Sequence, residues 1–447
     1  MKAPLRPASI AAYGTLGFPI ALLALPTYVY LPTLYTEGLG LSLVAVMAVL
    51  VGTRLLDAVT DPLVGWLSDH TVTRFGRRKP WIVAAVPVLA LSVYQLFLPP
   101  EGAGVVHLLL WASLLTVGWT MLTLPYNAWA AELTDRYHQR TSLTGARQIA
   151  ALVGTLVGAG VPALLAASGA TALADQTGAL ALLMIAALPL ALLPPLLFVP
   201  DRAPAGRQRL PLLPGLRAAF ANGPFRRLLA AFLVNAIANG IPVTLFLYFV
   251  THVLGMPEAR GPLLFAYFLS GLIAIPVWLI VSRRIGKHRA WCIAMIVASL
   301  AFVWTPLLVG PGDLAIFLVI TVLSGFGVGA DLALPASIQA DVVDLDTLER
   351  GEERTGTFFA LSGLLSKVAL AASAGLAFLP LALVGFDASA APGGNGTGAL
   401  LTLSVVYAGV PVALKLLAIA IMWRFPIDEA VQREIRLRME EAGAGRA

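Results

Sequence analysis

The chain has 447 residues, of which 58% are hydrophobic and only 12% are charged, whereas charged side chains make up about a quarter of an ordinary soluble domain. A surface in water needs charge and a surface in lipid does not, so this composition excludes a soluble enzyme and a disordered chain as starting hypotheses. The net charge of +6 would point to nucleic acid only if the cations gathered on one surface. The single cysteine, Cys292, excludes an intramolecular disulfide and a cysteine-built metal site.

Twelve apolar runs along the chain are each long enough to cross a bilayer, which takes about 20 residues. The first run is too long for a signal peptide and carries Pro19, Pro26 and Pro32 without a small-residue cleavage site. The sequence therefore predicts an all-α membrane protein with twelve transmembrane helices in contact with the lipid bilayer. We expect these helices at residues 9–35, 41–67, 81–99, 105–131, 143–168, 177–199, 225–252, 260–282, 290–310, 313–340, 356–385 and 399–424.

The arginines and lysines indicate the orientation, because cytoplasmic loops carry an excess of both. With the N-terminus inside, 26 of the 30 fall on the cytoplasmic side, Arg260 alone falls outside, and three fall within the runs: Arg54, Lys367 and Lys415. The sequence therefore predicts a multi-pass protein of the cytoplasmic (inner) membrane with both termini in the cytoplasm. Because topology accounts for the basic charge, we expect no nucleic-acid partner.

The two halves of the chain repeat each other. The segment 74–81, RFGRRKPW, follows the second run, and 284–291, RIGKHRAW, follows the eighth at a displacement of 210 residues. Matching Gly and Trp positions predict two six-helix bundles related by pseudo-two-fold symmetry, which is the architecture of the major facilitator superfamily. We expect an N-terminal bundle with the cation site at 1–199, a cytoplasmic middle loop at 200–224, a C-terminal bundle at 225–424 and a cytoplasmic tail at 425–447.

Two aspartates lie within the second run, where each charge needs an explanation. Asp57 and Asp61 are one helical turn apart, about 40° from each other on one face, and Thr60 adds a hydroxyl beside them. Like charges at this spacing repel unless a bound cation, a shared proton or a lysine lies between them. We favour a cation site, because carboxylates inside membranes mark ion pathways. The alternative is a permanent pairing with Arg54 that only joins two helices.

Three more charged residues lie within the runs. Lys367, in the eleventh run, is too deep to reach the membrane surface and is the natural counter-charge of the aspartates. Lys415 is nine residues from Arg424 at the inner edge, so we expect its side chain to extend to that surface. Asp331, after three glycines in the tenth run, either lines a cavity or binds freed backbone amides.

The remaining intramembrane polar and aromatic side chains are open to two interpretations. Asn235 either lines a cavity or joins helices by hydrogen bonds, and Trp119 and Tyr126 either stack on a solute or pack between helices. The sequence contains no phosphate-binding loop, nucleophile elbow or zinc-binding helix. We therefore expect no enzyme, no resident cofactor and no metal beyond a coupling Na⁺. A membrane-embedded enzyme that uses the aspartate pair and a channel are the alternatives.

The segments around the aspartate pair resemble one branch of the superfamily. DAVTDP at 57–62, GW at 65–66 and GRRKPW at 76–81 are similar to the signature of the glycoside–pentoside–hexuronide:cation symporters, the melibiose permease-like family. The similarity continues at LPY 124–126, EL 132–133, RT 140–141 and ADVVD 340–344, and at Lys367. It therefore spans both halves of the chain.

The resemblance implies roles for individual residues. The family's sodium site falls on Asp57 and Asp61, with Thr60 and Thr120 as neighbours, and Lys367 matches the family lysine near that site. From the residues themselves we expect Lys367 and Arg54 to balance the charge of the two aspartates. Arg147 matches an arginine near the sugar. We expect the substrate-binding residues to include Arg147, Thr123, Trp119, Tyr126, Asp331 and Asn235.

The sequence also departs from the family. The two aspartates that bind sugar hydroxyls are replaced by Ala21 and Thr123, so this chain cannot hold a pyranoside in the same way. The vertebrate lysophospholipid symporter shares the Asp-x3-Asp-Pro feature, so the branch is not confined to sugars. We predict Na⁺- or H⁺-coupled symport of a small solute by a monomer through alternating access. A sugar or glycoside is the expected solute, and a lysolipid or another amphiphile is the alternative.

The basic loops at 74–79 and 284–289 lie on the predicted cytoplasmic side of the two halves. We expect them to close this side as a gate through ion pairs with nearby acids. The residues proposed for this gate are Asp69, Arg74, Arg77, Arg78, Glu132 and Asp341.

Overall fold

The computed structural model describes residues 5–71, 73–134, 137–170, 172–200, 220–350, 355–427 and 429–444. Within these ranges every regular element is a helix, and twelve helical segments are long and apolar enough to cross a membrane. The prediction of an all-α protein with twelve transmembrane helices is confirmed. Most of the expected middle loop, residues 201–219, lies outside the described ranges.

The first span is a chain of short helical segments, because its prolines remove backbone donors and interrupt the regular hydrogen bonding. A π-helical turn begins at Pro26, and a second follows the short helix that contains Pro32. The elements of this span are α1 (Pro7–Gly14), α2 (Gly17–Leu25), η1 (Pro26–Tyr30), α3 (Leu31–Thr33) and η2 (Leu34–Gly38). The other five helices of this half are α4 (Leu43–His70), α5 (Lys79–Phe97), α6 (Val105–Leu133), α7 (Tyr137–Ala167) and α8 (Leu173–Phe198).

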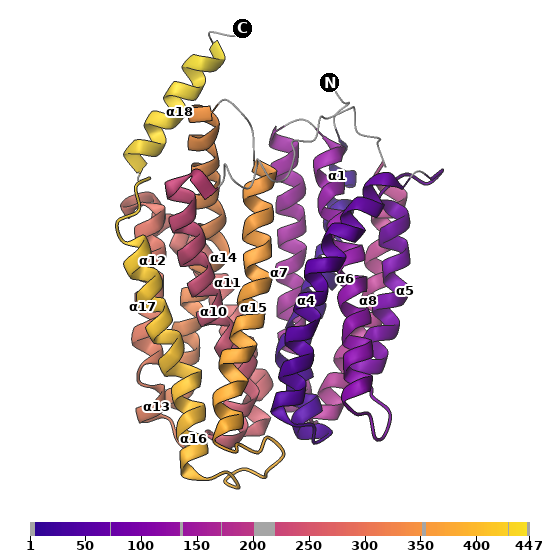
Figure 1. Cartoon of the computed structure of the whole chain (residues 1–447), viewed down its shortest axis with the longest axis vertical. Helices are drawn as coiled ribbons and strands as arrows, with labels where there is room; N and C mark the ends of the chain where they lie inside the picture. The colour runs from indigo at the N-terminus through magenta and orange to yellow at the C-terminus, as the bar shows by residue number, and fades with distance from the viewer. Residues whose placement is uncertain are drawn as a thin grey trace.

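The second half repeats this pattern and ends in an additional helix, α18 (Glu429–Ala444), which packs against α14. Figure 1 shows the halves as two helical bundles side by side, with both chain termini at the same end. The elements are α10 (Gly223–His252), η3 (Pro257–Ala259), α11 (Arg260–Ile285), α12 (Lys287–Phe302), α13 (Thr305–Leu308), α14 (Leu314–Arg350), α15 (Thr355–Leu383), α16 (Thr397–Ser404), η4 (Val405–Gly409) and α17 (Val410–Met422).

Glycines allow pairs of helices within each half to approach closely. A Cβ added at Gly154 on α7 would lie 2.2 Å from the carbonyl oxygen of Phe18 on α2. In the other half, a Cβ added at Gly325 on α14 would lie 2.4 Å from the carbonyl oxygen of Tyr267 on α11. Any larger residue would force these helix pairs apart, so both positions require glycine for backbone proximity.

The two halves share one hydrophobic core at the end of the molecule away from the termini, here called the distal end. Buried residues of the first span, such as Tyr30 and Tyr35, belong to the same cluster as Tyr248 and Phe249 of α10. At the terminal end, α10, α11, α12, α14, α15, α17 and α18 contribute to a separate cluster made only of C-terminal-half residues. Apolar packing therefore joins the halves mainly at the distal end.

Polar contacts between the halves also lie at the distal end. The hydroxyl groups of Thr36 and Tyr248 are 2.6 Å apart. The Glu37 carboxylate accepts a hydrogen bond from the Arg260 guanidinium at 2.5 Å, and Arg260 also donates to the hydroxyl of Thr251. Both Arg260 and Tyr248 are buried, so this contact is sealed from solvent.

Candidate functional site

A cluster of charged residues joins the two halves inside the membrane. Asp57 and Asp61 lie one turn apart on α4, as the sequence pattern requires, and Lys367 approaches them from α15 of the opposite half. The Lys367 ammonium lies 2.5 Å from Asp61 Oδ2 and 3.4 Å from Asp57 Oδ1. Thr120 on α6 donates its hydroxyl to Asp61 at 3.0 Å and lies 3.4 Å from Asp57. One lysine thus relieves the repulsion between two stacked carboxylates.

Arg54 and Thr60 complete this cluster on α4. Arg54 donates a hydrogen bond to Asp57 Oδ2 at 3.0 Å, and its guanidinium lies over the Tyr28 ring at 5.1 Å. The pairing of Arg54 with Asp57 therefore exists alongside the contacts of Lys367, and two cations face two carboxylates. The buried hydroxyl of Thr60 has no hydrogen-bond partner among the described residues. A buried hydroxyl of this kind pays a desolvation cost that a bound water or a bound ion can offset.

The side chains of α6 expected near the substrate make contacts within the protein. The Thr123 hydroxyl donates to the Trp119 carbonyl oxygen at 2.8 Å, one turn earlier on the same helix. Tyr126 is 1% exposed, donates to the Tyr13 carbonyl oxygen at 2.8 Å and stacks on the Tyr13 ring at 4.5 Å. Tyr126 is thus part of the packing between α6 and α1. Arg147 on α7 is half-buried and donates to Asn127 Oδ1.

A second charged cluster lies inside the C-terminal half around Asp331 on α14. Its carboxylate accepts hydrogen bonds from the amides of Asn235 and Asn239 on α10, both at 2.9 Å, and from the Trp291 indole on α12 at 2.6 Å. The Lys415 ammonium on α17 donates to the amide oxygens of the same two asparagines at 2.9 and 2.7 Å. It lies 3.7 Å from Asp331 Oδ2.

The expectation that Lys415 extends to the membrane surface is wrong. The residue is 8% exposed, because two asparagines and one aspartate from neighbouring helices satisfy its ammonium inside the bundle. Lys415 is close enough to Arg424 along the helix for its side chain to reach the membrane surface. Its partners on neighbouring helices are closer, and the ammonium binds them instead. Of the two interpretations of Asp331, the hydrogen bond to freed backbone amides is not found among the described residues, since its partners there are side chains.

Among the residues expected to form the cytoplasmic gate, the observed ion pairs join side chains of the same half. Arg78 donates to Glu132 and, at 3.0 Å, to Ser68, and Arg77 lies 3.6 Å from Glu132. In the other half Lys287 lies 2.6 Å from Asp341.

Two further residues of the expected gate need separate mention. Arg74 is exposed and lies over the Phe75 ring at 4.6 Å. The side chain of Asp69 lies outside the described part of the structure.

Sequence reasoning did not find the Glu37–Arg260 pair or the partners of Lys415. Arg260 was recognised as the single outer cation, and an acid at the same membrane edge, Glu37, was the available signal for its partner. No spacing in the sequence relates Asn239 or Asp331 to Lys415, because these residues come from three different helices.

Known proteins are similar to this chain in sequence and in fold. The chain is 25% identical to an uncharacterized symporter from Synechocystis sp. over 96% of each chain. It is 27% identical to the sodium-dependent lysophosphatidylcholine symporter 1 of Mus musculus, over 88% of this chain and 81% of that one. A bacterial homolog of the human lysosomal transporter Spinster, solved in an inward-facing and unoccupied conformation, superposes with a TM-score of 0.68 at 13% identity over 97% and 99% of the two chains.

Residues 12–429 match the family described as MFS/sugar transport protein, so the match covers both halves and all twelve spans from the first helix onward. The fold, the repeated halves and the motifs around the charged cluster agree with that match. The chain belongs to the MFS/sugar transport protein family and is a membrane transporter of the major facilitator type.

Proposed function

We propose that the protein is a secondary transporter that couples the inward movement of a cation to symport of an organic solute. The observation that carries this proposal is Lys367, which reaches across from the C-terminal half to two aspartates of the N-terminal half. A charge contact between the moving halves links the occupancy of a cation site to their arrangement. The named function of the mouse sodium-dependent relative supports the coupling.

The cation site consists of the carboxylates of Asp57 and Asp61 and the hydroxyls of Thr60 and Thr120. All four ligands supply oxygen, which Na⁺ and other hard cations prefer. The buried Thr60 hydroxyl has no partner among the described residues, which supports a role for its oxygen as a ligand of the cation. A proton on one carboxylate is the alternative coupling ion, because it also relieves the repulsion between the two acids.

Lys367 and the cation neutralise the same two carboxylates in turn. In the ion-free carrier Lys367 holds Asp61 and joins α4 to α15. Binding of Na⁺ releases Lys367, so that the halves can rearrange around the solute. A carrier in which the two carboxylates are only partly neutralised changes slowly between its inward-facing and outward-facing arrangements, because an unpaired charge in a low-dielectric interior is costly.

The distal contact and the shared core define the closed side of this conformation. With the termini in the cytoplasm, as the arginine and lysine distribution indicates, we infer a conformation that is closed toward the outside. Glu37 and Arg260 then form the outer gate. The pairs Arg78–Glu132 and Lys287–Asp341 lie on the inner side, where we expect them to exchange partners when the halves close. We place the protein in the cytoplasmic membrane as a monomer.

The solute is either a sugar or glycoside or an amphiphile such as a lysolipid. The family description favours the first and the mouse relative the second. Replacement of the family's sugar-binding aspartates by Ala21 and Thr123 weakens the case for a sugar. The Thr123 hydroxyl is already bonded to its own helix.

Melting temperatures in Na⁺, Li⁺ and choline salts at two pH values test the coupling ion, because a ligand that binds only the folded state raises the melting temperature. We expect Na⁺ to raise it, and Asp57→Asn or Asp61→Asn to abolish the rise. Asp175→Asn, an exposed acid on α8, is the matched control. A rise at the lower pH without a sodium effect would identify the proton. Full sodium responses in both site variants would refute the assignment.

A further inference from the structure

An imidazole lies beside the Glu37–Arg260 pair at the distal end. His252 is the last residue of α10, and it is 3% exposed. Its Nε2 atom lies 3.8 Å from Glu37 Oε1, whereas the Arg260 guanidinium holds Glu37 Oε2 at 2.5 Å. One carboxylate of the N-terminal half therefore faces a guanidinium and an imidazole of the C-terminal half.

Three buried polar atoms of this contact have no hydrogen-bond partner among the described residues. They are Glu37 Oε1, His252 Nε2 and Arg260 Nε. The imidazole nitrogen and the carboxylate oxygen are too far apart for a hydrogen bond, although a small movement would bring them within range. Because neither atom is engaged elsewhere in the described part of the chain, His252 Nε2 can take up a proton without losing a hydrogen bond there.

The loop between α15 and α16 covers the other side of the imidazole. His252 Nδ1 lies 3.4 Å from the Asn395 amide nitrogen, and the ring meets the Phe386 ring edge-on at 5.0 Å between centroids. The same Asn395 amide donates to the Asp387 carbonyl oxygen at 2.8 Å, which ties it to this loop. The charged groups that act on the imidazole in the described structure are Glu37 from η2, Arg260 from α11 and the exposed Asp387 from this loop.

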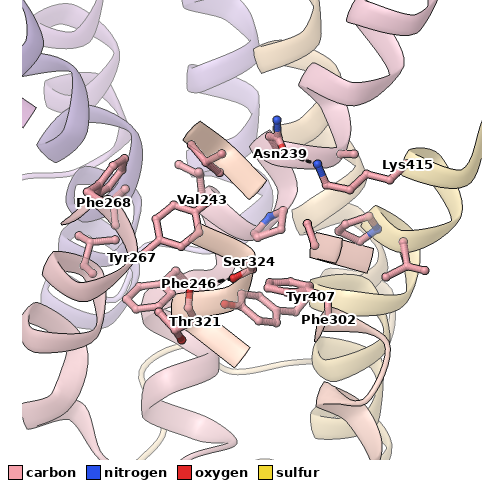
Figure 2. Close-up of a pocket in the computed structure, with 18 residues that line it drawn as sticks. Asn239, Val243, Phe246, Tyr267, Phe268, Phe302, Thr321, Ser324, Tyr407 and Lys415 are labelled. Carbon is pink, nitrogen blue, oxygen red and sulfur yellow. Dashed lines mark hydrogen bonds between the residues drawn. The ribbon is translucent and has the colours of Figure 1, made fainter. Parts of the chain in front are cut away.

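Aromatic side chains fill the C-terminal half on the membrane side of this contact. On α10, Phe246 lies between His252 and Asn239, which belongs to the Asp331–Lys415 cluster. Around it is a pocket of only about 50 Å³, here called the aromatic pocket, with Asn239 and Lys415 at one end (Figure 2). A space of this size holds at most a few water molecules, so it gives no wide aqueous path to His252. The lining aromatic residues are Phe246, Tyr267, Phe268, Phe302 and Tyr407.

We propose that His252 and Glu37 form a proton-binding site, separate from the aspartate pair, and that binding of a proton there opens the distal end. In the closed contact the single carboxylate already compensates one guanidinium. A proton that moves from water to His252 Nε2 adds a second cation, which this carboxylate cannot also neutralise in a sealed space. When the halves separate, water hydrates both cations, so the open arrangement binds the proton more readily and the proton favours that arrangement.

The distance between the halves at the distal end tests this proposal. In a Cys292→Ala background, spin labels at Glu101→Cys of the N-terminal half and Ala315→Cys of the C-terminal half, both exposed positions, report the distance by double electron–electron resonance. The protein in nanodiscs is measured without sodium at about pH 8 and about pH 5.5, because a solvated imidazole titrates near pH 6.5. We expect the population with the longer distance to rise at least fivefold at the lower pH. An unchanged or smaller population at the lower pH would overturn the proposal.

Substitutions of two histidines show whether the response comes from this site. His252→Gln keeps a polar, uncharged side chain but removes the proton acceptor, so it should abolish the pH response, and His252→Asn is a second uncharged variant for the same test. His107→Gln is the matched control, since His107 lies at the same end of the molecule and contacts the Gln95 carbonyl oxygen of its own half at 2.9 Å. It should retain the full response. A full response in both His252 variants, or its loss in His107→Gln, would contradict the assignment.

The sodium-dependent melting shift separates this inference from the coupling proposal. If sodium raises the melting temperature of the native protein but the distal distance does not respond to pH, the proton site alone is wrong. If the distance responds to pH through His252 and no cation shifts the melting temperature, the proton site stands and the cation coupling is wrong.

Discussion

In the proposed mechanism, single residues decide whether the charged cluster can exchange a lysine for a cation. Thr60 is informative, because its buried hydroxyl has no partner among the described residues, whereas the neighbouring Thr120 hydroxyl already binds Asp61. A buried hydroxyl without a partner costs free energy in the ion-free state and regains it only when a ligand arrives. The two threonines should therefore respond differently to substitution.

Thr60→Val should weaken sodium binding without destabilising the ion-free protein. Valine has nearly the same shape, and no hydrogen bond is lost, so we expect the ion-free free energy of unfolding to change by less than about 1 kcal/mol. Loss of one oxygen ligand should lower sodium affinity about tenfold, which is about 1.4 kcal/mol. Sodium titrations followed by melting temperature measure both quantities.

Thr177→Val, a buried threonine on α8 bonded to its own helix, is the control for this experiment. It should leave the sodium affinity unchanged. If Thr60→Val and Thr177→Val have the same sodium affinity, Thr60 is not a ligand.

At the scale of elements, η2 contacts both α10 and the start of α11 at the distal end, and we propose that these contacts hold that end closed. Glu37 lies in η2 at the end of the proline-interrupted first span, and Arg260 is the first residue of α11. Next to this ion pair, η2 also meets α10 through Thr36 and Tyr248. Because the pair is buried only while the halves are together, its energy contributes directly to the balance between closed and open distal ends.

Glu37→Gln should shift the transporter toward an open distal end. The substitution leaves the buried Arg260 without its counter-charge in the closed state, so we expect the open population to rise at least tenfold. Val29→Cys in a Cys292→Ala background reports the opening, since Val29 is 1% exposed at the interface. Its reaction with a water-soluble thiol reagent should accelerate by the same factor.

The matched control, Glu101→Gln, removes an exposed acid from the loop before α6 at the same end of the molecule. It should not change the labelling rate of the reporter cysteine. Equal labelling rates in Glu37→Gln and the parent would show that this ion pair does not hold the gate.

At the scale of the whole molecule, corresponding loops of the two halves carry corresponding ion pairs. Arg78 binds Glu132 at the end of α6, and Lys287 binds Asp341 near the end of α14. The repeated basic segments thus anchor each half internally at the terminal end. The halves share their hydrophobic core at the opposite end, which fits two rigid bundles that rock about a site between them.

The orientation of the whole molecule is open to a direct test. We expect a cysteine at Glu101 to react with a membrane-impermeant thiol reagent in intact cells, and a cysteine at Arg74 to react only after the membrane is permeabilised. Both residues are exposed and lie at opposite ends of the bundle. The native Cys292 is buried and should give a low background. The reverse labelling pattern would invert the predicted topology.

The sequence by itself determined the features that depend on local pattern. Apolar run lengths set the twelve spans, and the 210-residue displacement of two basic loops revealed the repeated halves. Helical periodicity placed Asp57 and Asp61 on one face, and depth in the membrane pointed to Lys367 as their partner. That contact exists, at 2.5 Å from Asp61, because a lysine so far from either surface needs an acid.

Only the tertiary structure decided which distant side chains meet. Lys415 was expected at the surface and is buried, because Asn235, Asn239 and Asp331 converge on it from α10 and α14. The aromatic pocket and the Glu37–Arg260 contact likewise join elements far apart in the chain. Composition and periodicity describe each helix alone. The partners of a buried polar group depend on how several helices pack together, and that packing is set by side-chain shape across the whole bundle.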